Sequence, residues 1–132
     1  MDYSELVYKA LEARKKAYAP YSKFKVGAAV IADNGEIYTG CNIENASYGA
    51  TNCAERTAIF KAVSEGHTKL NAIAIVGVEK DYTYPCGICR QVIAEFASED
   101  MKIVLGKNSG EYIVKTLEEI LPGAFTKEDL KK

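Results

Sequence analysis

The chain has 132 residues, 48% of them hydrophobic and 27% charged, a size and composition that suit a single globular domain over residues 1–132. A formal net charge of −1 and an isoelectric point near 5.9 argue against a nucleic-acid partner, because nucleic-acid-binding surfaces normally carry a basic patch. We expect no membrane partner either, because no apolar run approaches the roughly 20 residues that a membrane span needs.

The predicted elements begin with a helix over residues 4–18, where apolar side chains recur at helical spacing and Ala19-Pro20 ends the pattern. Two antiparallel strands are predicted next, over 25–32 and 36–43. Between them, Asp33-Asn34-Gly35 indicates a hairpin with a type I′ turn, because Asn-Gly tolerates positive φ angles.

A second helix is predicted over about 53–65, and the continuous apolar run 72–78 is typical of a central strand covered on both faces. A third helix over about 86–98 precedes two short strands, 102–106 and 111–115. The late strand–helix–strand order implies a crossover connection and a parallel part of the sheet. The predicted fold class is therefore α/β, a three-layer helix–sheet–helix sandwich around a mixed sheet of about five strands.

The chain has four cysteines, and its first residues lack the basic and apolar pattern of an export signal, so we expect a cytoplasmic protein whose thiols serve a metal or catalysis. Cys86 and Cys89 form a C-x-x-C pair at one predicted helix start, and Cys53 stands at another. Helix starts favour the thiolate form. Catalytic zinc sites keep three protein ligands and leave the fourth position to water. Three cysteines therefore predict a catalytic zinc ion.

Cys41 is the fourth cysteine and offers an alternative to that prediction. A fourth thiolate would close the metal site and make it purely structural. Cys41 lies within a predicted strand, one residue before Asn42. We favour its interpretation as a small buried strand residue, and the structural zinc module stays open as the rival.

Glu55 is the predicted proton carrier beside the metal, although Asn52 and Glu55 also fit a capping box at the helix start. Residues two apart in a helix point about 200° away from each other. Cys53 and Glu55 therefore converge only if Cys53 lies at the irregular helix entrance. Arg56 is the expected charge-tuning partner of the thiolates, with Arg90 as a weaker candidate.

Five segments that contain these residues resemble the small homotetrameric cytidine deaminases of nucleoside salvage. They follow one another in the expected order over nearly the whole chain. The segments are 19–28 (APYSKFKVGA), 40–49 (GCNIENASYG), 53–58 (CAERTA), 85–91 (PCGICRQ) and 121–125 (LPGAF). The resemblance implies one Zn²⁺ per chain, held by Cys53, Cys86 and Cys89, with Glu55 as the proton shuttle.

The same resemblance implies how a nucleoside binds. Asn42 and Glu44 would hydrogen-bond the ribose hydroxyls, Phe24 would pack against the pyrimidine ring, and the Ala54 backbone would help to fix the base. A homotetramer with shared active sites is also implied, in which neighbouring subunits complete each site. The residues implied in that sharing are Ala46, Tyr48 and Phe125.

The activity implied is zinc-dependent hydrolytic deamination of cytidine and 2′-deoxycytidine to uridine and 2′-deoxyuridine, with release of ammonia. Ile88 departs from the family pattern, which commonly has alanine between the ligand cysteines. We expect this bulkier side chain to alter the packing beside the metal or to shift the substrate preference. Two rival activities within the fold are a blasticidin S-type deaminase and a nucleic-acid editing deaminase. Asn42-Ile43-Glu44 favours a plain nucleoside over the first, and the acidic isoelectric point disfavours the second.

Overall fold

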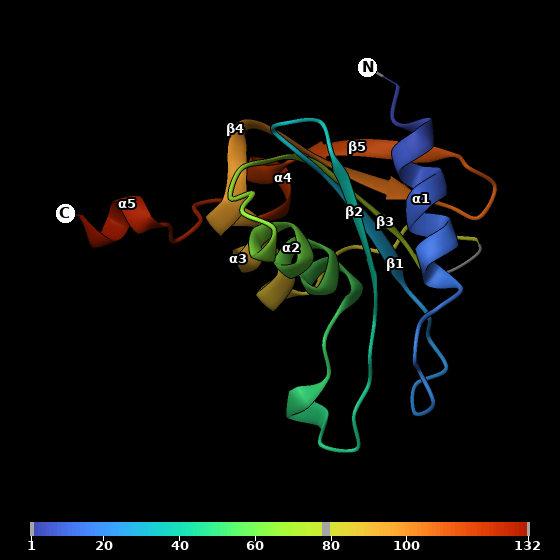
Figure 1. Cartoon of the computed structure of the whole chain (residues 1–132). Coiled ribbons are helices and arrows are strands. Elements are labelled where there is room, and N and C mark those ends of the chain that lie inside the picture. Colours follow the sequence, from blue (N-terminus) through green and yellow to red (C-terminus); the bar gives the residue numbers. More distant parts are fainter. Residues whose placement is uncertain (1, 78–79, 132) are drawn as a thin grey trace.

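A five-stranded mixed sheet forms the centre of the molecule (Figure 1), in a computed structural model that describes residues 2–77 and 80–131. The strands are β1 Gly27–Ala32, β2 Ile37–Cys41, β3 Leu70–Val76, β4 Ala97–Gly106 and β5 Tyr112–Thr116. Their order is β2-β1-β3-β4-β5, with β3 and β4 parallel and the other neighbours antiparallel. Residue 78 of the predicted apolar strand lies outside the described residues.

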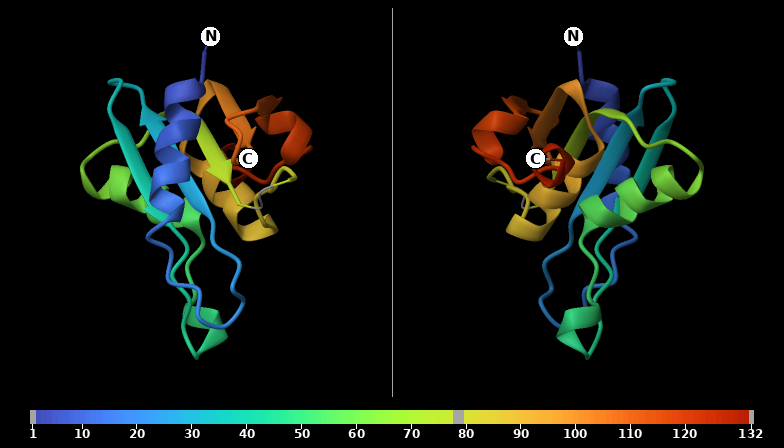
Figure 2. Two further views of the ribbon diagram at one scale, coloured as in Figure 1. Left: turned by 90° about the vertical axis from the view of Figure 1, so that its right-hand side faces the viewer. Right: turned by 90° about the vertical axis from the view of Figure 1, so that its left-hand side faces the viewer.

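Helices cover both faces of this sheet, as the views in Figures 1 and 2 agree. The helices among the described residues are α1 Ser4–Arg14, η1 Tyr48–Ala50, α2 Ala54–Ser64, α3 Gly87–Phe96, α4 Leu117–Ile120 and α5 Lys127–Leu130. The first helix, α1, covers one face, whereas α2 and α3 lie on the other. The predicted helix–sheet–helix sandwich is confirmed. Among the described residues, no helix has both the length and the apolar character required to cross a membrane.

Two buried layers, one on each face of the sheet, make up the core. On β3 the isoleucines Ile73 and Ile75 face α2 and α3, while Ala72 and Ala74 face α1. This alternation follows from the two-residue period of a strand. The small side chains under α1 and the large ones under α2 and α3 leave β3 buried on both faces, as its continuous apolar sequence predicted.

The first helix is shorter than the predicted range 4–18, because the chain after Arg14 pairs with a distant loop. Tyr18 N–H donates to the Asn42 carbonyl at 3.0 Å, and the Tyr18 carbonyl accepts from Glu44 N–H at 2.9 Å. These bonds place Tyr18 in an isolated bridge with Ile43. Tertiary pairing thus replaces the last helical turn that the sequence pattern favoured, and it fixes the loop that carries Glu44.

The hairpin between β1 and β2 forms where it was predicted, but the type I′ turn is wrong. Gly35 has φ of 89°, whereas Asn34 is not among the described residues with positive φ. Gly35 N–H donates to the Ala32 carbonyl at 2.9 Å, and Ala32 N–H donates to the Glu36 carbonyl at 2.9 Å. This is the three-residue hairpin in which a type I turn is followed by a left-handed glycine.

Candidate active site

Three thiols converge where the starts of α2 and α3 meet. Cys53 is the N-cap of α2, Cys86 is the N-cap of α3, and Cys89 lies in the first turn of α3. Their sulfur atoms all lie within 4.8 Å of one another, and the Cys53 and Cys86 sulfurs are 3.8 Å apart. Zinc bound tetrahedrally at about 2.3 Å from each sulfur would hold its sulfurs about 3.8 Å apart. The three cysteines therefore fit a zinc ion.

The alternative site with four sulfurs is not formed. Among the described residues, the only cluster of potential metal ligands contains Cys53, Cys86 and Cys89. Cys41 ends β2 and is half-buried, rather than fully buried as predicted. A metal held by the three clustered thiolates keeps one coordination position open, which is the arrangement of catalytic zinc.

One arginine side chain donates directly to the sulfur cluster. The Arg56 Nη2 atom donates to the Cys53 sulfur at 3.3 Å. The hydrogen bond from Cys89, followed by that from Arg56, lowers the pKa of the Cys53 thiol to about 5, against the effect of burial. Arg90, the weaker candidate, instead donates to two backbone carbonyls, those of Pro85 and Ile120, at 2.7 Å each. Arg56 is thus the arginine that contacts the thiolates.

Glu55 lies beside the cysteines and is almost completely buried, with 4% of its surface exposed. Cys53 has extended backbone angles of φ −76° and ψ 157°, so it and Glu55 are not held on opposite sides of a regular helix. The capping-box alternative is wrong, because α2 is capped at Cys53 with no side-chain capping bond. Burial raises the pKa of the Glu55 carboxyl to about 7, which suits a group that both accepts and donates protons near neutral pH.

A cavity of about 190 Å³ joins these reactive groups to the residues predicted to bind a nucleoside. Its lining comprises Ser22, Phe24, Val26, Asn42, Glu44, Thr51, Asn52, Cys53, Ala54, Glu55, Thr83, Tyr84 and Cys86. A wider hollow of about 420 Å³ shares Ser22, Glu44 and Thr51 with it and extends toward Tyr48. The largest cavity, about 710 Å³ near the start of α1, has no cysteine among its described lining residues, so its size does not mark the reactive site.

Asn42 and Glu44 organise the cavity wall through their side chains. The Asn42 amide accepts from Val26 N–H at 2.9 Å and donates to the Phe24 carbonyl at 2.8 Å, which fixes the backbone on both sides of Lys25. Glu44 accepts from the Ser22 hydroxyl and from Ser22 N–H. The hydroxyl bond is the main cause that lowers the pKa of the Glu44 carboxyl. Glu44 is therefore ionised and keeps acceptor capacity for a ligand.

The residues implied to act across subunits do not line this cavity within one chain. Tyr48, in η1, is 77% exposed, and Phe125 is 60% exposed on the segment after α4, while Ala46 is also exposed. Gln91 on α3 donates to the Phe125 carbonyl at 2.6 Å, which holds the backbone of this segment in place. The Phe125 side chain nevertheless remains exposed. Ile88 is likewise 62% exposed and is not among the described lining residues.

Sequence reasoning gave no site role to six of the lining residues, which are Ser22, Val26, Thr51, Asn52, Thr83 and Tyr84. Ser22 lies within the segment 19–28 but carries no metal or proton chemistry of its own, and only its bonds to Glu44 mark its place in the site. The position of Tyr84 carried a usable signal, because it stands two residues before the ligand Cys86. A residue so close to a metal ligand in sequence must lie near the metal in space.

Comparison with known proteins agrees with this geometry. Residues 1–106 match the family model described as the cytidine and deoxycytidylate deaminase zinc-binding region. The cytidine deaminase of Halalkalibacterium halodurans is 53% identical over 130 residues, covering 98% of both chains. That of Sporosarcina psychrophila is 52% identical over 130 residues, covering 98% of this chain and 96% of its own. The crystal structure of cytidine deaminase from Burkholderia pseudomallei superimposes with a TM-score of 0.88 at 46% identity, covering 95% of this chain and 100% of that one.

Proposed function

The chain belongs to the family of zinc-dependent cytidine and deoxycytidylate deaminases, and on that premise we propose that it hydrolyses cytidine and 2′-deoxycytidine. The products are ammonia and either uridine or 2′-deoxyuridine. This reaction would belong to pyrimidine salvage. The observation that carries the proposal is the buried Glu55 carboxyl beside three clustered thiols, in a cavity that Phe24 and Glu44 also line.

Cys53, Cys86 and Cys89 would hold one zinc ion per chain, as their sulfur spacing allows. A zinc ion held there supplies a nucleophilic water at neutral pH, because it lowers the pKa of that water to about 7. The Arg56 guanidinium donates to the Cys53 sulfur and withdraws negative charge from it. This contact counters the formal charge of −1 that three thiolates give to the zinc site and so favours loss of the water proton.

Glu55 would carry both protons of the reaction. It accepts one proton from the attacking water and delivers it to N3 of the cytosine ring, which makes C4 electrophilic. The water oxygen, now bonded to C4 as a hydroxyl, gives its second proton to Glu55, which passes it to the exocyclic amino group. The C4–N bond then breaks, ammonia leaves and the C4 carbonyl of the uracil base remains. Burial places the pKa of Glu55 at about 7, so neither accepting nor donating a proton is strongly unfavourable.

The remaining cavity residues would bind the nucleoside. Phe24 provides an aromatic wall for the pyrimidine ring, and the Ala54 backbone lies beside the reactive groups to fix the base. Asn42 and Glu44 would contact the ribose hydroxyls. Glu44 retains acceptor sites for the 3′-hydroxyl, which cytidine and 2′-deoxycytidine share, so both nucleosides are expected substrates.

We propose further that the enzyme is a homotetramer with shared active sites. Tyr48 and Phe125 are large aromatic residues that stay exposed in the isolated chain. Exposed aromatic groups on segments beside a cavity are typical of surfaces that another chain covers. Ala46 lies in the same protruding loop as Tyr48 and would enter the neighbouring site with it.

The direct test is the loss of ultraviolet absorbance when the zinc-loaded protein is mixed with cytidine. We expect rapid loss with cytidine and 2′-deoxycytidine and none with blasticidin S. Glu55→Gln should keep zinc but lose about 10²–10⁴-fold in kcat, the usual contribution of general acid–base catalysis. Glu65→Gln, at the other end of α2, is the matched control and should keep full activity. Near-normal kcat in Glu55→Gln would refute the shuttle role.

A further inference from the structure

Tyr84 lines the reactive cavity, although no sequence motif assigned it a role. It lies between β3 and α3 and is 47% exposed, and it shares the cavity wall with Phe24, Glu55 and Cys86. The wider hollow on the Tyr48 side does not include Tyr84 among its described lining residues. Tyr84 therefore belongs to the metal end of the site and not to its outer end.

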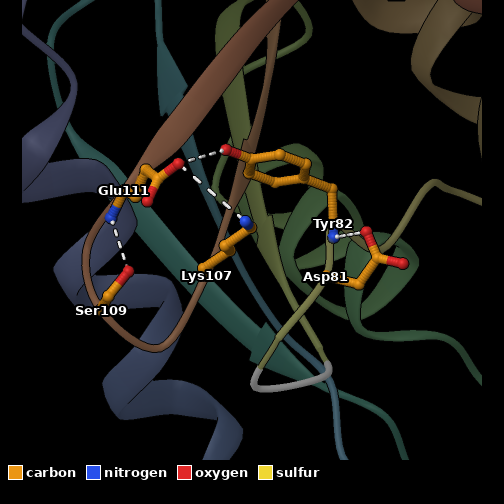
Figure 3. Close-up of polar contacts among 5 residues, drawn as sticks. All are labelled: Asp81, Tyr82, Lys107, Ser109 and Glu111. Atoms are coloured by element: carbon orange, nitrogen blue, oxygen red, sulfur yellow. Dashed lines mark hydrogen bonds and ion pairs between the residues drawn. The ribbon is translucent and has the colours of Figure 1, made fainter.

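The segment that carries Tyr84 is anchored on the turn between β4 and β5, as Figure 3 shows. The Tyr82 hydroxyl donates to a Glu111 carboxylate oxygen at 3.2 Å, and the Lys107 ammonium lies 4.6 Å from the centre of the Tyr82 ring. Lys107 and Glu111 also form an ion pair at 3.9 Å. Tyr82 packs against the core on the α2 and α3 side of the sheet. These contacts fix the backbone two residues before Tyr84.

The residues on either side of Tyr84 are also fixed. A Cβ atom built on Gly77 would lie 2.2 Å from the Thr83 hydroxyl, so Thr83 packs tightly against the end of β3. Pro85 is fully buried, and its carbonyl accepts from Arg90 Nε at 2.7 Å. With both neighbours held, the backbone of Tyr84 is fixed where its side chain lines the cavity.

In the cavity wall, Glu55 comes from α2, whereas Cys86 and Tyr84 come from the N-cap of α3 and the segment before it. C4 of the pyrimidine has two ring neighbours, N3 and C5. If Glu55 on α2 serves N3, then the residues that approach from the start of α3 face C5. Cys86 and Tyr84 are those residues in the cavity wall. A pyrimidine that presents N3 to Glu55 would then turn its C5 edge toward the part of the wall that includes Tyr84.

Resting on the proposed deaminase function, we propose that Tyr84 is a specificity-determining residue. Its ring limits the size of the substituent that a pyrimidine nucleoside can carry on C5, next to the reacting carbon. Tyr82, Lys107 and Glu111 act as positioning residues for this wall. Cytidine fits against Tyr84, whereas 5-methylcytidine carries a methyl group that meets the ring.

The test compares kcat/KM for cytidine and 5-methylcytidine in zinc-loaded Tyr84→Ala and wild-type protein. We expect the variant to raise the 5-methylcytidine to cytidine ratio about tenfold or more, because one methyl group in a tight pocket changes kcat/KM about 10- to 200-fold. Tyr84→Leu retains more volume and should give a smaller rise. Tyr8→Ala, which removes an exposed tyrosine from α1, is the matched control and should leave the ratio unchanged.

An unchanged ratio in both Tyr84 variants, with zinc content and cytidine turnover measurable, would overturn the specificity role. An equal loss of both substrates would overturn it as well. Failure of the wild-type protein to deaminate cytidine would instead refute the proposed function, so the two failures are distinguishable.

The positioning residues have their own test. Lys107→Ala removes the cation from above the Tyr82 ring and should shift the substrate ratio in the same direction as Tyr84→Ala, by a smaller factor and without loss of zinc. Lys115→Ala, on β5 of the same hairpin, is the control and should not shift it. A ratio that moves in Tyr84→Ala but not in Lys107→Ala would remove the positioning role and leave Tyr84 as the specificity residue.

Discussion

At the scale of single residues, Arg56 donates to the Cys53 sulfur at 3.3 Å, the contact through which we propose that it tunes the charge of the metal site. We predict that Arg56→Gln lowers kcat about 10- to 100-fold, in the range known for residues that hydrogen-bond metal ligands. Arg56→Lys should lose less, because it keeps the positive charge but not the planar guanidinium. The measurements are kcat and zinc content. Unchanged kcat in Arg56→Gln would show that the contact is only structural.

Asn42 has a structural task that can be separated from substrate binding. Asn42→Ala would leave the buried Val26 N–H and the Phe24 carbonyl without their partners. An unpaired buried polar group costs about 1–3 kcal/mol, so we predict that loss in the free energy of unfolding, measured by urea denaturation without substrate. Asn71→Ala, at an exposed position of β3, is the control and should stay within about 0.5 kcal/mol of wild type.

That the three cysteines and Glu55 lie together was predictable from the sequence, because metal and proton chemistry restricts the residue types that can perform it. The contacts around them were less predictable. Arg56 and Arg90 both stand close to ligand cysteines in sequence, and only the structure shows that Arg90 donates to carbonyls while Arg56 donates to sulfur. Glu44 was predicted to bind the ribose hydroxyls. Its hydrogen bonds with Ser22 were not predictable, because Ser22 lies 22 residues away in the sequence.

At the scale of elements, the close packing of α2 on β2 sets the position of the metal ligands. A Cβ atom at Gly40 would lie 2.4 Å from the Ala58 nitrogen and 2.8 Å from the Ala54 carbonyl oxygen. Both contacts are with helix backbone, so Gly40→Ala must push α2 away from the sheet. Overpacking of this kind costs about 1–3 kcal/mol.

We therefore predict that Gly40→Ala lowers both the free energy of unfolding and the retention of zinc against a chelator, because α2 begins directly after Cys53. Gly49→Ala is the matched control, since a Cβ atom there meets nothing within 4 Å. Equal zinc retention in the two variants would show that the start of α2 does not depend on this contact.

The elements themselves were predicted well wherever local pattern decides, and less well at their ends. The third helix was expected to continue to Ser98, but α3 ends at Phe96 and β4 begins at Ala97. The early part of β4 pairs irregularly with β3: Leu70 opposes Ala97, while Ala72 opposes Lys102. Partners that lie far away in the sequence decide these ends, and such pairings have no local signal.

At the scale of the whole molecule, the loop between β2 and α2 extends away from the sheet with η1 at its tip, and the C-terminal segment with α5 extends on another side (Figure 1). Neither Tyr48 nor Phe125, which these segments carry, lines the cavity of its own chain. One chain thus holds the reacting groups of a site, while two of the aromatic residues implied in substrate binding face outward. No sequence pattern shows that Tyr48 and Phe125 lie apart from the reacting groups of their own chain, because this depends on how distant segments are arranged in space.

A subunit-mixing experiment tests whether neighbours complete each site. Phe125→Ala and Glu55→Gln chains should each form nearly inactive tetramers, the first for lack of an aromatic group and the second for lack of a proton shuttle. If the two chains are co-expressed and assemble at random, about a quarter of the sites combine an intact Glu55 with an intact Phe125 from a neighbour. We therefore predict a clear gain in kcat per tetramer over either variant alone. The same variants purified separately and mixed without subunit exchange are the control. Activity no higher than that control would mean that each chain uses its own Phe125 or none.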